Sequence, residues 1–315
     1  MFRVYTSLSE LGPDAAPCAL TIGNFDGVHQ GHRRILRRVI ELSAELRLTP
    51  SVLTFDPHPT KVVAPSRAPR LLSSPEQRLR LLEKEGIEQV FVLPFNLAFS
   101  QLTALDFVKQ VLVETLHAKA VMVGDNFRFG NRASGDTRLL QHLGVEYGYT
   151  TEIIGGVEMR GRRVSSSEVR SLVDKGAVSM ACRLLGRPYA VEGSVVHGHG
   201  IGSKQTVPTL NLDTKAEILP AVGVYITRTT DLEAARSWPS ITNVGYRPTF
   251  DGDRLTVETF LLTPLEGETP QRIQVEFLRR VREEKKFDSP EVLKTQIFKD
   301  VGRAKAYFRR TDRLY

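Results

Sequence analysis

Cysteines and long apolar stretches are both scarce in this sequence, and each shortage excludes a class of protein. The 315 residues contain two cysteines, Cys18 and Cys182. Their separation does not fit a CxxC site, and neither has neighbours at metal-ligand spacing, so we expect two buried thiols. No stretch approaches the roughly 18 apolar residues of a membrane span. The first residues also lack the apolar core of a secretory signal. We therefore expect a cytoplasmic protein with no membrane partner.

Positive charge is in excess, but it is concentrated at one end of the chain. The net charge is +7, and residues 279–315 hold 12 Lys+Arg against 6 Asp+Glu. This segment also has apolar residues at helical spacing, which is typical of a helix with a solvated face. A polyanion-binding surface is the less frequent alternative. Because zinc spacing, an RNA-binding signature and interleaved aromatic residues are all missing, we expect no nucleic-acid partner. The sequence leaves self-association open.

The chain is long enough for two domains at roughly 150 residues each, and its pattern changes near residue 187. Before that point, short apolar runs alternate with helical periodicity. Such alternation predicts a parallel sheet covered on both faces, with ligands at the carboxyl ends of the strands. We expect strands at 18–23, 51–55, 90–93, 119–123 and 151–154, and helix faces at 35–46, 105–116 and 139–143.

The part that follows residue 187 has the pattern of an antiparallel barrel. Short runs follow one another without helices between them, which is typical of a barrel or sandwich. A final helix near 289–309 is opened by Ser289 and Pro290. We therefore predict a Rossmann-like α/β domain over 1–186 and a C-terminal antiparallel β-barrel with a terminal helix over 187–315. The expected barrel strands are 189–197, 207–212, 222–229, 240–246, 255–263 and 272–278.

Two histidines follow the first strand, in the segment GNFDGVHQGHRRIL at residues 23–36. His29 and His32 are spaced i and i+3 across Gly31, so both imidazoles lie on one side of a helix N-terminus. The backbone N–H groups and the dipole at that end attract phosphate, and glycine lets a triphosphate approach the backbone. Such imidazoles can stabilise the charge that develops on an α-phosphate under attack. Two surface histidines beside a turn are the plainer alternative.

These motifs resemble those of a known enzyme family. HQGH is similar to the HxGH signature of class I nucleotidyltransferases. Together with TFDPHP at 54–59, GDNFRFG at 124–130 and the serine-rich segment at 163–170, it resembles the adenylyltransferase module of bacterial bifunctional riboflavin kinase/FAD synthetases. The resemblance implies catalytic roles for His29 and His32 and flavin contacts for His58, Asp125 and Asn126. It also implies nucleotide or phosphate contacts for Gly23, Asn24, Phe25, Asp26, Gly31, Arg163, Ser166 and Arg170.

The serine-rich segment also suggests a phosphate site on physical grounds. Its serines precede a helical pattern, so they can cap that helix and offer hydroxyl and N–H groups to a phosphate. Arg163 and Arg170 flank this terminus and can clamp the phosphates that leave as pyrophosphate. An ordinary capped helix with solvated arginines is the alternative. On the residues alone, Asn126 is a turn residue, His58 is a loop histidine, and Phe127 and Phe129 belong to the core.

A second phosphate loop is expected in GSVVHGHGIGSKQTVPTLNL at residues 193–212. Gly198 and Gly202 leave the backbone free to wrap a phosphate chain. Thr209 and Asn211, two residues apart on an extended strand, point the same way and suit shared coordination of Mg²⁺ and a nucleotide phosphate. A Gly-rich hairpin with a polar turn is the alternative. The segment resembles the riboflavin kinase module, whose PTAN is PTLN here, although residues 203–207 depart from that family.

Glu258 is the lone carboxylate of the strand VETFLL. A kinase needs a base beside the accepting hydroxyl and a metal for the γ-phosphate, so Glu258 is our candidate base. A solvent-facing strand residue is the alternative. The family usually has His after the Glu-Thr pair, where this chain has Phe260. The resemblance implies that the second domain phosphorylates riboflavin to FMN and the first adenylylates FMN to FAD with release of pyrophosphate, using ATP and Mg²⁺.

Two rival functions differ in the residues they require. A nucleotidyltransferase for another phosphate ester shares HxGH but lacks the PTLN and Glu258 half. A flavin-binding regulator without catalysis, contacting RNA through the basic terminal helix, lacks His29, His32 or Glu258. All of these residues are present, which favours the bifunctional enzyme.

Overall fold

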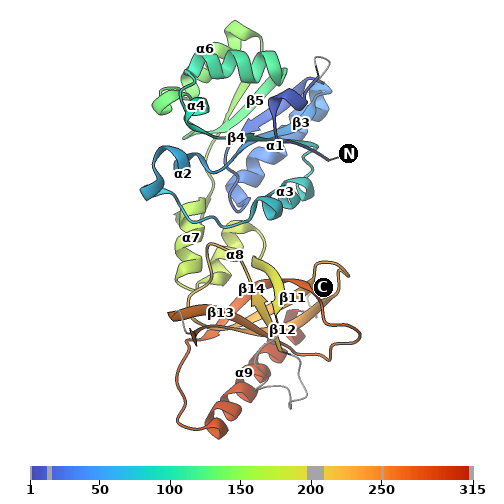
Figure 1. Cartoon of the computed structure of the whole chain (residues 1–315). Coiled ribbons are helices and arrows are strands. Elements are labelled where there is room, and N and C mark those ends of the chain that lie inside the picture. The colour runs from blue at the N-terminus through green and yellow to red at the C-terminus, as the bar shows by residue number, and fades with distance from the viewer. Residues whose placement is uncertain (1, 13–15, 197–208, 250–251, 312–315) are drawn as a thin grey trace. The chain divides into compact units, whose positions relative to one another are not determined.

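The protein consists of two compact units (Figure 1), with the division between Ser166 and Ser167. The computed structural model describes residues 2–12, 16–196, 209–249 and 252–311. Each unit contains its own sheet.

A parallel sheet forms the first unit. Its strand order is β1-β4-β3-β2-β5-β6, and neighbouring strands pair in parallel throughout. From β2 the chain first builds outward through β3 and β4, and then returns to add β5 and β6 on the other side of β2. Ligands bind outside the carboxyl ends of the strands at such a reversal. The strands are β1 (Arg3–Tyr5), β2 (Cys18–Ile22), β3 (Thr49–Asp56), β4 (Gln89–Pro94), β5 (Ala118–Gly124) and β6 (Thr150–Ile154).

Helices cover both faces of this sheet because its strands alternate between two apolar clusters. Leu20 of β2 lies in a cluster with the helices η3 and α6, whereas its neighbour Ala19 lies in a cluster with α1 and α3. Side chains one residue apart on a strand point to opposite faces, so each face has its own core. The helices are α1 (Gln30–Leu46), α2 (Pro59–Val63), α3 (Pro75–Lys84), α4 (Leu97–Ser100), α5 (Ala104–Asp106), the π-helix η3 (Phe107–Thr115) and α6 (Thr137–Tyr147), with short 3-10 turns at Leu8–Glu10, Pro65–Arg67 and Asn131–Ala133.

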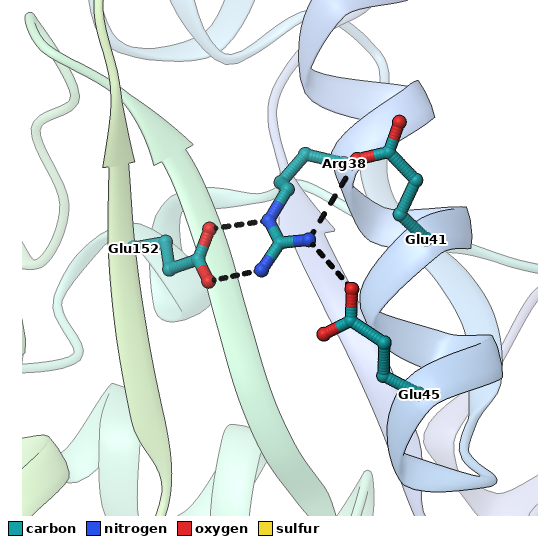
Figure 2. A network of polar contacts seen from close by, with 4 residues as sticks. All are labelled: Arg38, Glu41, Glu45 and Glu152. Carbon is teal, nitrogen blue, oxygen red and sulfur yellow. Dashed lines mark hydrogen bonds and ion pairs between the residues drawn. The ribbon is translucent and has the colours of Figure 1, made fainter.

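A charged network ties α1 to the edge strand β6 (Figure 2). Arg38 of α1 donates from Nε and Nη2 to the two carboxylate oxygens of Glu152, both at 2.8 Å. Its Nη1 lies 3.1 Å from a carboxylate oxygen of Glu45 and 3.6 Å from one of Glu41. The hydrogen bonds from Arg38 lower the pKa of Glu152, although burial acts the other way. A two-pronged contact of this kind fixes orientation as well as distance, so it adds an oriented contact between α1 and β6.

The second unit begins with two helices and continues as a closed antiparallel barrel of order β10-β13-β12-β11-β14-β9. A short hairpin of β7 (Glu158–Met159) and β8 (Arg162–Arg163) precedes α7 (Ser166–Asp174), whose first residue is the last of the first unit. The other elements are α8 (Val178–Leu185), β9 (Tyr189–Val196), β10 (Thr209–Asp213), β11 (Gly223–Asp231), β12 (Ser237–Thr249), β13 (Gly252–Leu261), β14 (Arg272–Arg282) and α9 (Pro290–Thr311).

Hydroxyl groups fill part of the barrel interior. The side chains are fully buried and bonded to one another, for example Thr227 Oγ1 to Thr242 Oγ1 at 2.7 Å and Thr242 Oγ1 to Thr259 Oγ1 at 2.7 Å. Buried polar groups are tolerated when they are hydrogen-bonded. On the outer face, α9 packs with Ala304 and Phe308 against apolar residues of β11 and β12. Because Thr259 points inward, its neighbours Glu258 and Phe260 face outward.

The predicted fold class is confirmed, with additions at the edges. All five predicted strands of the first domain are present, and the structure adds the edge strand β1 and the helices α2 and α3. The helix α8 also lies where no helix was predicted. The predicted boundary between residues 186 and 187 lies just after α8. The two compact units, in contrast, divide between residues 166 and 167. The domain ranges 1–186 and 187–315 stay a prediction.

The Arg38–Glu152 contact predicts a stability that depends on pH. Because the folded pKa of Glu152 lies below its ordinary value of 4.5, the stabilisation is present above pH 4.5 and is lost as the pH falls through the folded pKa. We expect Glu152→Gln to lower the free energy of unfolding by up to about 1 kcal/mol at pH 7 and to flatten its decline in acid. Urea unfolding at pH 7 and pH 3.5 measures both, with the exposed Glu88→Gln as control. Equal losses in the two variants contradict the prediction.

Candidate active sites

The connection from β2 to α1 turns through positive φ angles that buried side chains hold in place. Phe25 has φ 49°, Gly27 has φ 76° and Val28 has φ 38°. The left-handed region disfavours residues with a side chain, most of all β-branched ones. Phe25 and Val28 are 2% and 1% exposed, so burial of these two side chains offsets the backbone strain. Strain of this kind is concentrated at functional turns.

The paired histidines lie at the first turn of α1. His29 is the N-cap, and its Nδ1 accepts a hydrogen bond of 3.2 Å from the N–H of His32. Because Nδ1 is an acceptor, the proton of the neutral ring is on Nε2. The two rings stack with centroids 3.7 Å apart. A Cβ on Gly31 would lie 3.1 Å from two atoms of the His29 ring, so a side chain there would displace that ring. The structure thus brings His29, Gly31 and His32 together as the spacing predicted.

Asp26 joins this loop to two other segments. Its carboxylate, 3% exposed, accepts hydrogen bonds from the N–H of Leu72 at 2.9 Å and of Ser73 at 3.2 Å. Its backbone carbonyl accepts from the hydroxyl of Ser166 at 2.9 Å. These contacts support a positioning role for the Asp26 carboxylate, because it is occupied by backbone donors. They also place Ser166, the first residue of α7, beside the loop that carries His29.

Asn24 connects the loop to His58 and to a buried arginine. Its side-chain Nδ2 lies 2.9 Å from Nε2 of His58. Its carbonyl accepts from Nη1 of Arg78 at 3.1 Å. Arg78, which is 5% exposed on α3, was not among the predicted site residues. A signal was available, since Arg78 stands four residues before Leu82 and so shares its buried helix face.

Asp125 and Arg163 are paired with each other. Nη2 of Arg163 lies 2.7 Å from Oδ1 of Asp125, and both side chains are about half exposed. Asn126 follows Asp125 at the carboxyl end of β5. The rings of Phe127 and Phe129 stack with centroids 5.5 Å apart and belong to the core on the η3 and α6 face, which confirms the core prediction for them. Gly23 leads from β2 into the loop. A Cβ added to Gly23 would lie 3.3 Å from the Phe25 ring.

Arg170 lies on α7 within the second unit. Its Nη1 is 3.5 Å from Oγ of Ser167. Its role as a phosphate clamp stays a prediction. Gly198 and Gly202 lie outside the described residues, as does the altered segment 203–207.

The barrel brings the predicted kinase residues onto one face. Asn211 of β10 pairs with Glu258 of β13, and Glu258 pairs in turn with Asn243 of β12. One pleat along, Thr209 pairs with Phe260. Residues directly opposite in antiparallel strands present their side chains on the same face, and so do residues two apart on one strand. The predicted metal ligands and the predicted base are therefore neighbours.

A cavity of about 830 Å³ opens beside this face. Glu258, Asn243 and Phe260 line it from the barrel, and residues 284–290 with the first turns of α9 line it from the other side. Nε of Arg282 lies 2.7 Å from the buried carboxylate of Asp300, which joins β14 to α9 at the wall. Volumes of several hundred Å³ with a few convergent polar groups are typical of small-molecule sites. The wall contributed by residues 284–288 was not predicted, because that segment has no strand or helix periodicity, whereas Ser289 and Pro290 were predicted to open the terminal helix.

Thr209 and Asn211 are suited to a metal ion that the phosphates of a bound nucleotide also coordinate. Mg²⁺ prefers oxygen ligands, keeps several waters and is completed by substrate phosphates, so a hydroxyl and an amide oxygen from the protein are compatible with such an ion. The described part of the chain holds no cluster of three or more His, Cys, Asp or Glu that could bind a metal ion. Within the same residues, no helix is long and apolar enough to cross a membrane.

Paired imidazoles at the switch point of a doubly wound sheet, joined to a barrel with a carboxylate in its cavity, define a two-domain transferase. The FAD synthetase family model matches residues 12–168, and the riboflavin kinase family model matches 185–308. The chain belongs to the bifunctional riboflavin kinase/FMN adenylyltransferase family, as its sequence motifs predicted.

Individual relatives agree with this assignment over almost the full length. The bifunctional riboflavin kinase/FMN adenylyltransferase of Pseudomonas fluorescens is 39% identical, covering 96% of this chain and 97% of that protein. That of Escherichia coli K12 is 37% identical, covering 92% and 93%. A solved structure described as a macrolide-efflux protein from Streptococcus pneumoniae is similar at a TM-score of 0.85 and 26% identity, covering 96% and 98%.

The Asp26 contacts predict a graded loss of stability. Asp26→Ala leaves the N–H groups of Leu72 and Ser73 buried without their acceptor, so we expect a loss of about 2 kcal/mol. Ser73→Ala removes a hydroxyl that donates to Asp26 at 3.3 Å and accepts from the N–H of Gly27 at 3.2 Å, and it should cost about 1 kcal/mol or less because the Asp26 carboxylate keeps its backbone donors. Urea unfolding followed by circular dichroism measures both. The single tryptophan, Trp238, lies in the second unit, so its fluorescence transition serves as an internal control. Equal effects of the two substitutions contradict the graded prediction.

Proposed function

We propose that the chain makes FAD from riboflavin in two successive reactions, one in each unit. The barrel transfers the γ-phosphate of ATP to riboflavin, giving FMN and ADP. The α/β unit then transfers the adenylyl group of a second ATP to FMN, giving FAD and pyrophosphate. The observation that carries the proposal is the presence of two separate sites, one with paired imidazoles at a helix N-terminus and one with a carboxylate in a cavity.

In the kinase reaction, Glu258 is the base. It lines the cavity, so it can take the proton from the 5′-hydroxyl of riboflavin as that oxygen forms its bond to the γ-phosphorus of ATP and the bond to ADP breaks. Thr209 and Asn211, on the same barrel face, would hold Mg²⁺. The ion supplies positive charge that offsets the charge of the phosphates. Phe260 offers an apolar surface beside the carboxylate.

In the adenylyl transfer, positioning and electrostatics do the work. A phosphate oxygen of FMN forms a bond to the α-phosphorus of ATP, and the bond to pyrophosphate breaks. His29 and His32 donate hydrogen bonds to the charge that develops on the α-phosphate, and the N–H groups of α1 add to this field. Ser166 and Arg163 hold the departing phosphates. His58, Asp125 and Asn126 face the flavin nucleotide. No covalent enzyme intermediate is needed.

We further propose that both reactions take place in the cytoplasm. The proposal is supported by the two cysteines, which are both free thiols, the usual state in a reducing compartment. Cys18 is buried as predicted, whereas Cys182 is half-buried.

Single substitutions should separate the two reactions. We expect Glu258→Gln to lower FMN formation from riboflavin about 100-fold or more while FAD formation from supplied FMN continues. His29→Ala should form FMN at the normal rate and lower FAD formation about 100-fold or more. Incubation with flavin, ATP and Mg²⁺, followed by chromatography of riboflavin, FMN and FAD, measures both rates.

Matched controls are available in the same chain. Glu268→Gln and His142→Ala change an exposed glutamate and an exposed histidine of the same two units, and both variants should keep the two rates. If Glu258→Gln makes FMN normally, or His29→Ala makes FAD normally, the assigned role of that residue is wrong.

The predicted metal ligands give a separate test. Asn211→Ala should raise the Mg²⁺ concentration for half-maximal kinase rate about tenfold, because one of the two protein oxygens is lost. The Mg²⁺ dependence of FAD formation from FMN should stay unchanged, since that reaction belongs to the other unit. Titration of each reaction with Mg²⁺ measures the shift. A kinase with an unaltered Mg²⁺ requirement excludes Asn211 as a ligand.

A further inference from the structure

A charged side chain is buried behind the phosphate-binding loop of the first unit. Arg78 lies in the first turns of α3, which begins with a capping box of Ser74 and Gln77. It is 5% exposed. Burial lowers its pKa, while the negative charges of Asp26 and Asp56 act in the opposite direction. A buried cation is costly unless its partners compensate it, so the position calls for a specific role.

The described contacts do not make Arg78 an optimal structural ion pair. The described residues give its buried Nε no hydrogen-bond partner. Its Nη1 donates a hydrogen bond to a neutral group, the carbonyl of Asn24, at 3.1 Å. An apolar side chain of similar length would fill the same space without this desolvation cost. The buried guanidinium is therefore better explained by its hydrogen bond to the Asn24 carbonyl than by a contribution to the free energy of unfolding.

The carbonyl of Asn24 lies where the loop conformation is set. It belongs to the peptide bond that leads into Phe25, where φ becomes positive at 49°. The hydroxyl of Thr54 donates to the same carbonyl at 3.4 Å. Two donors on one carbonyl fix the plane of the peptide unit, and the plane in turn sets the direction in which the chain enters the turn before His29.

The Asn24 side chain extends the same connection to α2. Its Nδ2 lies 2.9 Å from Nε2 of His58. His58 caps α2, and its Nδ1 accepts from the N–H of Thr60 at 3.2 Å. A chain of contacts thus runs from Arg78 through Asn24 to His58, and it links three elements that meet at the carboxyl ends of β2 and β3.

We propose that Arg78 is a positioning residue for adenylyl transfer, because its buried guanidinium holds the Asn24 carbonyl and so fixes both the phosphate-binding loop and the amide that meets His58. The inference rests on the proposed assignment of adenylyl transfer to the first unit. Arg78 acts through Asn24 and does not itself touch the reacting atoms.

The test compares Arg78→Lys and Arg78→Met in the full chain, with ATP varied at saturating FMN. We expect Arg78→Met to raise the KM for ATP about tenfold, because the loop is no longer held. Arg78→Lys should recover part of this loss, since lysine keeps the charge but not the planar fork. Riboflavin phosphorylation by the same samples should be unchanged. Arg80→Lys, an exposed arginine of the same helix, is the matched control and should behave as wild type.

The KM value distinguishes positioning from stability. A purely structural Arg78 would reduce the folded fraction, which lowers the apparent kcat and leaves the KM of the remaining enzyme unchanged. If Arg78→Met does not fold, Arg78→Lys decides the question by the same measurement. An unchanged KM for ATP in the folded variant overturns the proposal.

A double-mutant cycle tests the route through Asn24. Asn24→Ala removes the amide but keeps the backbone carbonyl that Arg78 holds. The part of the Arg78→Lys loss that passes through the amide should therefore disappear, and adding Arg78→Lys to Asn24→Ala should cost less than Arg78→Lys alone. Additive losses contradict the proposed route. Failure of the underlying functional assignment is visible separately, because in that case His29→Ala retains full adenylyl transfer.

Discussion

The hydrogen bond from the His32 N–H to Nδ1 of His29 is the contact around which the first unit is organised. It lies where the loop ends and α1 begins, and the two rings stack on each other there. This is also the place where the strand order of the parallel sheet reverses. A helix can offer its N-terminal N–H groups to a ligand only if the preceding loop is held aside. Buried Phe25 and Val28, the carboxylate of Asp26 and the guanidinium of Arg78 hold it.

The sequence predicted those parts of the fold that depend on local pattern. Each apolar run of the first domain became a strand, and His29, Gly31 and His32 met as their spacing required. The metal candidates Thr209 and Asn211 share a face because they lie two residues apart on one strand. The pairing that places Asn211 opposite Glu258 came from the structure. β1 was missed because its three residues are too few to show a period.

Other parts of the sites depend on long-range contacts that no local pattern reveals. The carboxylate of Asp26 accepts hydrogen bonds from the N–H groups of Leu72 and Ser73, which lie 46 and 47 residues further along the chain. The cavity wall at 284–290 is placed by the Arg282–Asp300 contact, which joins a strand to a helix. The mutual pairing of Asp125 and Arg163 likewise appears only when the β7–β8 hairpin returns the chain toward β5. Residues with ordinary local surroundings acquire their roles by such tertiary placement.

The hydrogen-bonded interior of the barrel restricts where a small molecule can bind in the second unit. Five buried hydroxyls form a closed ring of hydrogen bonds, those of Thr227, Thr229, Ser240, Thr242 and Thr259, so every hydroxyl hydrogen of the ring already has an acceptor. The cavity lies between barrel strands and α9, and of these five residues Thr242 alone is part of its lining. Substitutions in α9 and in the segment before it therefore change the cavity without removing a strand pair or a hydroxyl of the ring. The shape of the cavity and the closure of the barrel can vary largely independently.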